Sequence, residues 1–264
     1  MLYYLRKIQS EGKVKRVFRT LVFHEVRPES ELALGQRPIQ VADGYEDSLP
    51  MPLYVSVAHF QEQINFLQEQ KYHCLTVNEI KAFYEKNQQL PEKSVFLTFD
   101  DCYQSLKEYA YPILKKANMK ATVFVVKGWL FSEEETYHPE RSQCLSVKEV
   151  EAMADVFETA NHTTHFHKRK GTTLSQPMWE PKGRVEEDIL ECNQFVTHKD
   201  VFAYPFGLYN QETVSILEEM NFRLAFTTKS GWNSLETPPL ELHREVIPEA
   251  MSLQAFQLLM KEEA

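Results

Sequence analysis

The sequence predicts an α/β fold: a parallel sheet that is covered by helices and forms one barrel-like domain. Three observations support this. Short apolar runs alternate with amphipathic stretches along the chain. The runs are apolar almost throughout, as in strands that are buried on both faces. The length of 264 residues suits a single α/β barrel domain.

The strands are predicted from runs rich in Val, Phe and Thr, which favour extended backbone. The sequences are TLVFH, SVFLTF, ATVFVV, VFAYPF and LAFTT, at residues 20–24, 94–99, 121–126, 201–206 and 224–228.

Helices are predicted where a capping residue precedes an apolar stripe of period 3.6. Two capping boxes and two single caps meet this condition: Thr76 with Glu79, Ser146 with Glu149, Asn210, and Ser252. Leu106, Tyr109 and Ile113 also have helical spacing. Pro112 is expected to kink or end that helix, because proline removes a backbone donor.

Residues 27–54 break the alternation of strands and helices. The segment holds four prolines, at positions 28, 38, 50 and 52, and has no clear periodicity. Loops of this length are uncommon unless they have a function or are insertions. We expect the segment either to border a substrate groove or to be a plain insertion.

Charge separates the first 19 residues from the rest. They contain six basic residues and one acidic residue, whereas the whole chain has a formal net charge of −9. The overall charge argues against nucleic-acid binding. We divide the chain into a basic segment, 1–19, and one domain, 20–264. The basic segment is interpreted first as a solvated helix, and alternatively as a peripheral contact with an anionic membrane.

Targeting signals are not evident in the sequence. It has no apolar stretch of about 18 residues, and its first residues are charged too early for a secretory signal. As written, the chain is expected to be cytoplasmic or membrane-peripheral, and at the cell surface if a signal segment was removed. The four cysteines are widely spaced without a CxxC, which favours reduced thiols.

Polar residues follow several predicted strands directly. His24, the pair Asp100–Asp101, and His162 each come after an apolar run, and Pro205 interrupts another. The carboxyl ends of parallel strands meet at one edge of a sheet, where active sites of α/β folds lie. These residues are therefore candidates for one shared site.

The segment NHTTHFH, residues 161–167, suggests a metal site. It contains His162, His165 and His167. Two histidines and one carboxylate form a common catalytic metal site, with positions left for water and substrate. A His-rich exposed loop is the alternative when this segment is considered alone.

Four segments together resemble the polysaccharide deacetylase family, the NodB-homology carbohydrate esterases. They are SVFLTFDDCY, FETANHTTHFH, FAYPFGLYN and LVFHEV, and the resemblance runs from about Thr20 to Phe256. It implies a distorted (β/α) barrel. The five-residue step from His162 to His167 is similar to the poly-N-acetylglucosamine deacetylase branch, in which an N-terminal histidine is the general acid; His24 matches that histidine.

The resemblance implies a division of roles. Asp101, His162 and His167 would hold a divalent metal, zinc first, with nickel, cobalt or iron also accepted by this ligand set. A metal-bound water would attack the acetamide, with Asp100 as general base and His24 as general acid. The turn of Tyr204, Pro205, Phe206 and Gly207 would contact substrate, with a backbone N–H near Phe206 for the oxyanion.

Three further residues are secondary candidates. His165 is a rival metal ligand, and His243 in LELH is a rival acid, although LHREVI aligns equally well with a Leu-x-Arg ending. Trp232 could line a pocket for the acetyl methyl group, with core packing as the alternative. The chain departs from the family in having Cys102 where glycine is usual, and in lacking the usual arginine near Ala203.

The predicted function is therefore metal-dependent N-deacetylation of an N-acetylhexosamine-containing glycan or a lipid-linked sugar precursor. Two alternatives remain open. One is a catalytically silent relative that binds glycan, which Cys102 keeps under consideration. The other is a metal amidase with a non-sugar substrate, since the same chemistry cleaves other amides.

Overall fold

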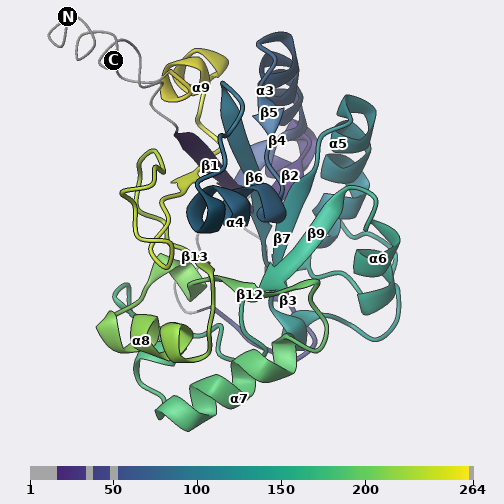
Figure 1. Ribbon diagram of the computed structural model, residues 1–264. Coiled ribbons are helices and arrows are strands. Elements are labelled where there is room, and N and C mark those ends of the chain that lie inside the picture. The colour runs from purple at the N-terminus through teal and green to yellow at the C-terminus, as the bar shows by residue number, and fades with distance from the viewer. Residues whose placement is uncertain (1–16, 34–37, 48–52, 262–264) are drawn as a thin grey trace, which may run out of the picture.

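The main element is a parallel sheet of eight strands (Figure 1). The computed structural model describes residues 17–33, 38–47 and 53–261. The strands are β1 (Phe18–Phe23), β5 (His73–Cys74), β6 (Ser94–Asp100), β7 (Ala121–Val125), β9 (Phe157–Asn161), β12 (His198–Ala203), β13 (Leu224–Phe226) and β14 (Glu245–Val246). Their order is β13-β12-β9-β7-β6-β1-β14, and β5 pairs with the start of β6.

The sheet curls until its two edges are linked by one segment of chain. At one edge, Phe226 of β13 forms a parallel bridge with Leu242. A few residues later, β14 pairs with β1 at the opposite edge. We call residues 242–246 the seam. This arrangement confirms the predicted distorted (β/α) barrel and the single domain.

Helices cover the outside of the sheet. They are α3 (Val57–Glu69), α4 (Val77–Lys86), α5 (Tyr111–Ala117), α6 (Val147–Ala152), α7 (Lys182–Cys192), α8 (Gln211–Glu219) and α9 (Leu253–Leu259). All four predicted caps are present: Thr76 and Ser146 form capping boxes, and Asn210 and Ser252 each accept a bond from an amide three residues later. Helices α7 and α8 lie together next to β12 and β13 (Figure 1).

The helical run around Pro112 is interrupted, as expected, and divides into two helices. A π-helix, η1 (Leu106–Ala110), leads directly into α5, and Pro112 lies in the first turn of α5. Proline is tolerated there because the first-turn amides need no partner within the helix. The wide π turn before it absorbs the irregularity, so the helical path continues past the proline.

Alternation along β6 determines which side chains enter the barrel. Val95, Leu97 and Phe99 pack in the outer core, beneath the helices. Phe96 packs inside the barrel, with Phe226 at a ring-centroid distance of 5.4 Å. Successive side chains of a strand point to opposite faces. Asp100 therefore follows Phe96 and Thr98 on the inner face.

Shorter elements surround one end of the barrel. They are β2 (Glu25–Arg27), α2 (Glu29–Leu32), β3 (Ile39–Gln40), β4 (Tyr54–Ser56), β8 (Ser142–Gln143), β10 (Arg169–Lys170), β11 (Leu174–Ser175), and the 3₁₀ turns η2 (Lys127–Trp129), η3 (Gln176–Met178) and η4 (Pro205–Gly207). β2 pairs with β4, and β3 pairs with β8. The irregular segment 27–54 is thus attached to the domain by two small parallel sheets.

The predicted basic segment, 1–19, lies largely outside the described residues; of its last residues, Phe18 and Arg19 belong to β1. Among the described helices, none combines the length and the apolar character that crossing a bilayer requires. All four cysteines are free thiols, in line with the absence of a disulfide pattern in the sequence.

The capping box at the start of α4 gives a test of the fold. The Thr76 hydroxyl accepts a bond from the Glu79 amide, and the Glu79 carboxylate accepts bonds from the Thr76 amide and hydroxyl. We expect Thr76→Ala to lower the free energy of unfolding by about 1 kcal/mol, because an amide in the first turn loses its partner. Urea unfolding measures this. Thr173→Ala, at an exposed position, is the control and should change nothing; equal stability of both variants would contradict the prediction.

Candidate active site

A cavity of about 370 Å³ lies at the carboxyl ends of the strands, close to the lower limit for small-molecule pockets. Its floor carries the predicted residues His24, Asp100, Asp101, His162 and His167. Its walls are aromatic, and the residues are Tyr45, Tyr54, Tyr103, Trp129 and Phe206. Segment 27–54 contributes two of these rings, so it borders the pocket.

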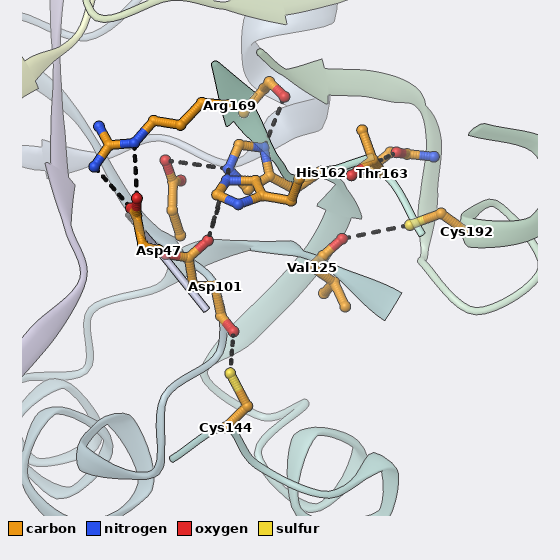
Figure 2. Close-up of polar contacts among 12 residues, drawn as sticks. Asp47, Asp101, Val125, Cys144, His162, Thr163, Arg169 and Cys192 are labelled. Atoms are coloured by element: carbon orange, nitrogen blue, oxygen red, sulfur yellow. Dashed lines mark hydrogen bonds and ion pairs between the residues drawn. The ribbon is translucent and has the colours of Figure 1, made fainter. Parts of the chain in front are cut away.

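Asp101, His162 and His167 form the centre of the site. Their ligand atoms all lie within 4.8 Å of one another. The two Nε2 atoms are 3.1 Å apart, and Asp101 Oδ1 is 3.8 Å from His162 Nε2 and 3.6 Å from His167 Nε2. All three residues are buried. Figure 2 shows Asp101 and His162 turned toward the same point.

The three residues fit a divalent cation. His162 Nδ1 donates to the carbonyl of Ala203 at 2.7 Å, so the lone pair is left on Nε2, which faces the centre. Asp101 Oδ1 is buried without a hydrogen-bond partner. A buried oxygen without a partner is costly, and a bound cation would remove that cost.

Burial changes the protonation of all three residues, and the two histidines are in the form that binds a cation. Burial and the neighbouring charge of Asp100 raise the pKa of Asp101 well above its usual range, although a hydrogen bond with Tyr103 opposes this. Burial lowers the pKa of His162, and burial together with His162 and His24 lowers that of His167 much further. Neutral imidazoles are the form that binds metals. A divalent cation would bring Asp101 back to its ionised form.

Asp100 is held by an arginine that comes from the seam. Arg244 donates two parallel bonds to it, Nη1 to Oδ1 at 2.7 Å and Nη2 to Oδ2 at 2.9 Å, and the Arg244 side chain is fully buried. Burial opposes ionisation of Asp100, but Arg244 and the nearby imidazoles outweigh it and keep the pKa below its usual value. Asp100 is therefore a fixed carboxylate beside the Asp101 cluster.

The two acids belong to a turn with unusual backbone angles. Asp101 has φ 75° and Cys102 has φ 61°, which are left-handed values that cost a non-glycine residue about 1–2 kcal/mol. The turn is held by surrounding bonds. Cys144 Sγ donates to the Asp101 carbonyl at 3.1 Å (Figure 2). The Leu145 amide donates to the Cys102 carbonyl at 2.8 Å. Cys102 thus takes the conformation for which glycine is favoured, with its thiol in the core.

The loop between the two histidines is fixed from helix α7. Asp188 accepts bonds from the amides of Thr164 at 2.8 Å and His165 at 2.7 Å. Thr163, in the five-residue step from His162 to His167, has φ 79°. On the other side, Gly128 donates to the Thr164 carbonyl at 2.8 Å, and a Cβ at Gly128 would lie 2.6 Å from that oxygen. The approach of these two loops therefore requires glycine.

His24 lines the pocket near Asp100. Burial lowers its pKa to about 4. The charge of Asp100 opposes this shift, and the charges of Arg244 and His162 add to it. Its imidazole is therefore neutral at pH 7.

The predicted substrate turn is divided between the pocket and the core. Phe206 and Gly207 line the cavity, and Phe206 has φ 59°. The Phe206 ring lies 4.3 Å from that of His167. Tyr204 and Pro205 are buried, and the Tyr204 hydroxyl donates to the Leu240 carbonyl at 2.9 Å. These two residues support the turn from behind.

The structure does not bring the three secondary candidates to the floor of the pocket. The His165 side chain is half exposed, 3.4 Å from Asp43. His243 Nδ1 is 3.2 Å from the carbonyl of Trp232. Trp232 stacks on the Arg19 guanidinium at 4.3 Å, which agrees with a packing role.

Several residues of the site were not singled out from the sequence as functional. Arg244 lies 144 positions from Asp100, and only the Leu-x-Arg alignment pointed to it. Trp129 follows the strand ATVFVV, and its position after a strand end was an available signal. Tyr45 stacks on Trp129 at 5.4 Å, and Asp47 pairs with Arg169 through two bonds of 3.0 and 2.7 Å (Figure 2).

Removing the partner of Asp100 is expected to destabilise the metal-free protein. We expect Arg244→Met to lower the free energy of unfolding by about 3–5 kcal/mol, since a buried carboxylate is left unpaired. The double variant Arg244→Met/Asp100→Asn should recover most of that loss, because it removes the charge as well. Urea unfolding in the presence of a chelator measures both. A single variant as stable as the wild type would show that the pair is not stabilising.

Loosening the histidine loop is expected to weaken metal binding. Asp188→Asn places an NH₂ group against the loop amides, so we expect zinc affinity to fall about 10- to 100-fold. Competition with a chromophoric chelator measures the affinity. Glu191→Gln, at an exposed position of the same helix, is the matched control and should bind zinc as the wild type does. Equal affinities for the three proteins would rule out this role.

Sequence and structure comparisons agree with this geometry. A poly-β-1,6-N-acetyl-D-glucosamine N-deacetylase of Staphylococcus aureus is 28% identical over 180 residues, 66% of this chain. The match spans 60% of that relative's length. The Bacillus subtilis protein YxkH, described as a putative polysaccharide deacetylase, is 28% identical over 219 residues, which cover 79% of this chain and 74% of the relative.

Solved structures show the same fold. Streptococcus pyogenes deacetylase PplD, in complex with acetate, superposes with a TM-score of 0.73 at 23% identity, covering 94% of this chain and all of that one. IcaB from Ammonifex degensii gives 0.70 at 20% identity, with 93% and 96% coverage. The family model described as polysaccharide deacetylase matches residues 87–225, more than half of the chain. The chain therefore belongs to the polysaccharide deacetylase family.

Proposed function

We propose that this chain is a metal-dependent hydrolase that removes N-acetyl groups from an N-acetylhexosamine-containing glycan. The observation that carries the proposal is the buried cluster of Asp101, His162 and His167 beside the fixed carboxylate of Asp100. The Staphylococcus aureus relative, whose name states this activity, supports the proposal.

The metal and the protein would contribute different parts of the chemistry. A divalent cation on the three ligands supplies Lewis-acid activation of water and of the acetamide carbonyl. Zinc is the first choice, and nickel, cobalt and iron also suit two imidazoles and a carboxylate. Asp100 is ionised and held by Arg244, so it is ready to accept a proton from water.

His24 would complete the proton transfer. Hydrolysis of an amide takes one proton from water and gives one to the leaving nitrogen. Because its pKa is about 4, His24 has no proton of its own to give at neutral pH. We propose that it passes on the proton that Asp100 accepts, and so acts as the acid of the second step.

The walls would hold the sugar and the oxyanion. Pyranose rings present apolar faces, and the aromatic walls offer matching surfaces. The backbone N–H of Phe206 is proposed to donate to the developing oxyanion, since its turn lies against His167. A lipid-linked sugar precursor is the proposed substrate if the chain acts inside the cell at a membrane, with contact through its basic first residues. A surface polymer is the proposed substrate if the chain acts outside.

Substitution of the two aspartates separates the proposed roles. Asp101→Ala should lose the metal, because it removes one of three ligands. Asp100→Asn should keep the metal but release acetate at least about 100-fold more slowly, since general base catalysis contributes that much. Elemental analysis and acetate release from N-acetylglucosamine oligomers measure the two effects.

Each result has a clear meaning. Full activity of Asp100→Asn would rule out its role as base. No acetate from the metal-loaded wild type, with oligomers still bound, would favour the catalytically silent glycan-binding relative. Release of acetate from simple amides but from no sugar would favour an amidase.

A further inference from the structure

Glu25 is a buried carboxylate in the pocket wall that the proposed chemistry does not use. It follows His24 directly, and its side chain is 3% exposed. Asp100, Asp101, His162 and His167 on the floor are buried to a similar degree. Glu25 is therefore as buried as the residues of the floor, and like them it lines the pocket.

The two oxygens of Glu25 have different surroundings. Oε2 accepts from Arg27 Nε at 2.8 Å and from Ser105 at 3.2 Å, and it lies 2.7 Å from Arg27 Nη2. Oε1 accepts from the Ser142 hydroxyl at 2.5 Å. Ser142 also lines the pocket. Each oxygen of an ionised carboxylate has about two acceptor positions, so Oε1, which has one donor, can accept a second from the pocket side.

Two carboxylates share the Arg27 guanidinium. Arg27 Nη1 is 2.9 Å from Glu31 Oε2, and Glu31 also accepts bonds from the hydroxyls of Tyr109 and Tyr137. Glu31 is not part of the pocket wall. One arginine can neutralise only one carboxylate, so this group carries an extra negative charge. Burying such a charge is costly unless donors satisfy it.

We propose that Glu25 is a substrate-binding residue that accepts a hydrogen bond from a hydroxyl group of the hexosamine ring. This rests on the proposed function and names the part of the substrate that the wall recognises. A sugar hydroxyl is a neutral donor of the size that the pocket admits. Arg27 and Ser105 hold Oε2 in place, and Oε1 meets the ring beside the acetamide position.

The test compares Glu25→Gln with Glu31→Gln. Both substitutions take one negative charge from the same arginine, and only the first changes the pocket wall. We expect Glu25→Gln to raise KM for N-acetylglucosamine oligomers about tenfold, because a bond to a charged acceptor is lost. Zinc content should stay the same. Glu31→Gln should keep the KM of the wild type, although both variants lose stability in urea.

Binding is measured separately from turnover, in the Asp100→Asn background, by titration of zinc-loaded protein with the same oligomers. Analogues that lack one ring hydroxyl at a time identify the group that is recognised. The wild type and Glu25→Gln should bind the analogue that lacks the recognised hydroxyl with equal affinity. Glu25→Asp, which keeps the charge and withdraws it by one methylene, replaces Glu25→Gln if that variant does not fold.

The outcomes distinguish this inference from the proposed function. If oligomers bind and no acetate is released, the proposed function fails while the dissociation constants still test Glu25. Equal KM and Kd values for wild type and both Glu25 variants would overturn the inference, as would equal increases in Glu25→Gln and Glu31→Gln. The inference is supported if KM and Kd increase in the Glu25 variants but not in Glu31→Gln, and if this increase is absent for one deoxy analogue.

Discussion

The ion pair between Arg244 and Asp100 is the constraint on which the rest of the site depends. Asp100 and Asp101 are adjacent carboxylates, and both are buried. One guanidinium cannot neutralise both, and its two bonds go to Asp100. Asp101 is thereby left without a cationic partner among neutral imidazoles, and burial together with Asp100 raises its pKa well above the usual range. The pair thus produces both a fixed base candidate and an environment that favours a divalent cation.

The same pair connects the site to the closure of the barrel. Arg244 lies in the seam, between the bridge to β13 and the strand that pairs with β1. Its Nε also donates to the carbonyl of Thr227 at 2.8 Å. The contact between Arg244 and Asp100 therefore forms only when the two edges of the sheet have come together. The residue that pairs with Asp100 thus belongs to the same short segment that closes the sheet.

Local patterns predicted much of this structure. The capping residues at Thr76 and Ser146 needed only neighbours three positions away, and the apolar runs gave the strands. Strand ends meeting at one edge predicted that Asp100, Asp101 and His162 share a site, and the choice of His167 over His165 came from the family resemblance. Pro112 predicted an irregular helix, because it lacks a backbone donor, but not that the turn before it would be a π-helix.

Long-range contacts account for what the sequence left undetermined. Arg244 is far from Asp100 in the chain, and its role depends on the closure of the sheet. Asp188 on α7 supports a loop more than 20 residues away through backbone amides, which leave no trace in the sequence. For segment 27–54 the sequence left two alternatives, the border of a groove or a plain insertion, and the position of Tyr45 and Tyr54 in the pocket wall decides for the first.

Residues 39–47 reach the rest of the pocket through side chains and one short strand. Tyr45 stacks on Trp129, and Asp47 accepts two hydrogen bonds from Arg169. None of these contacts belongs to the main sheet or its helices. Substitutions in this stretch would therefore alter the wall of the pocket and leave the main sheet and the cluster of Asp101, His162 and His167 in place. The stretch that shapes the wall of the pocket is thus separate in this chain from the strand ends that carry the buried cluster.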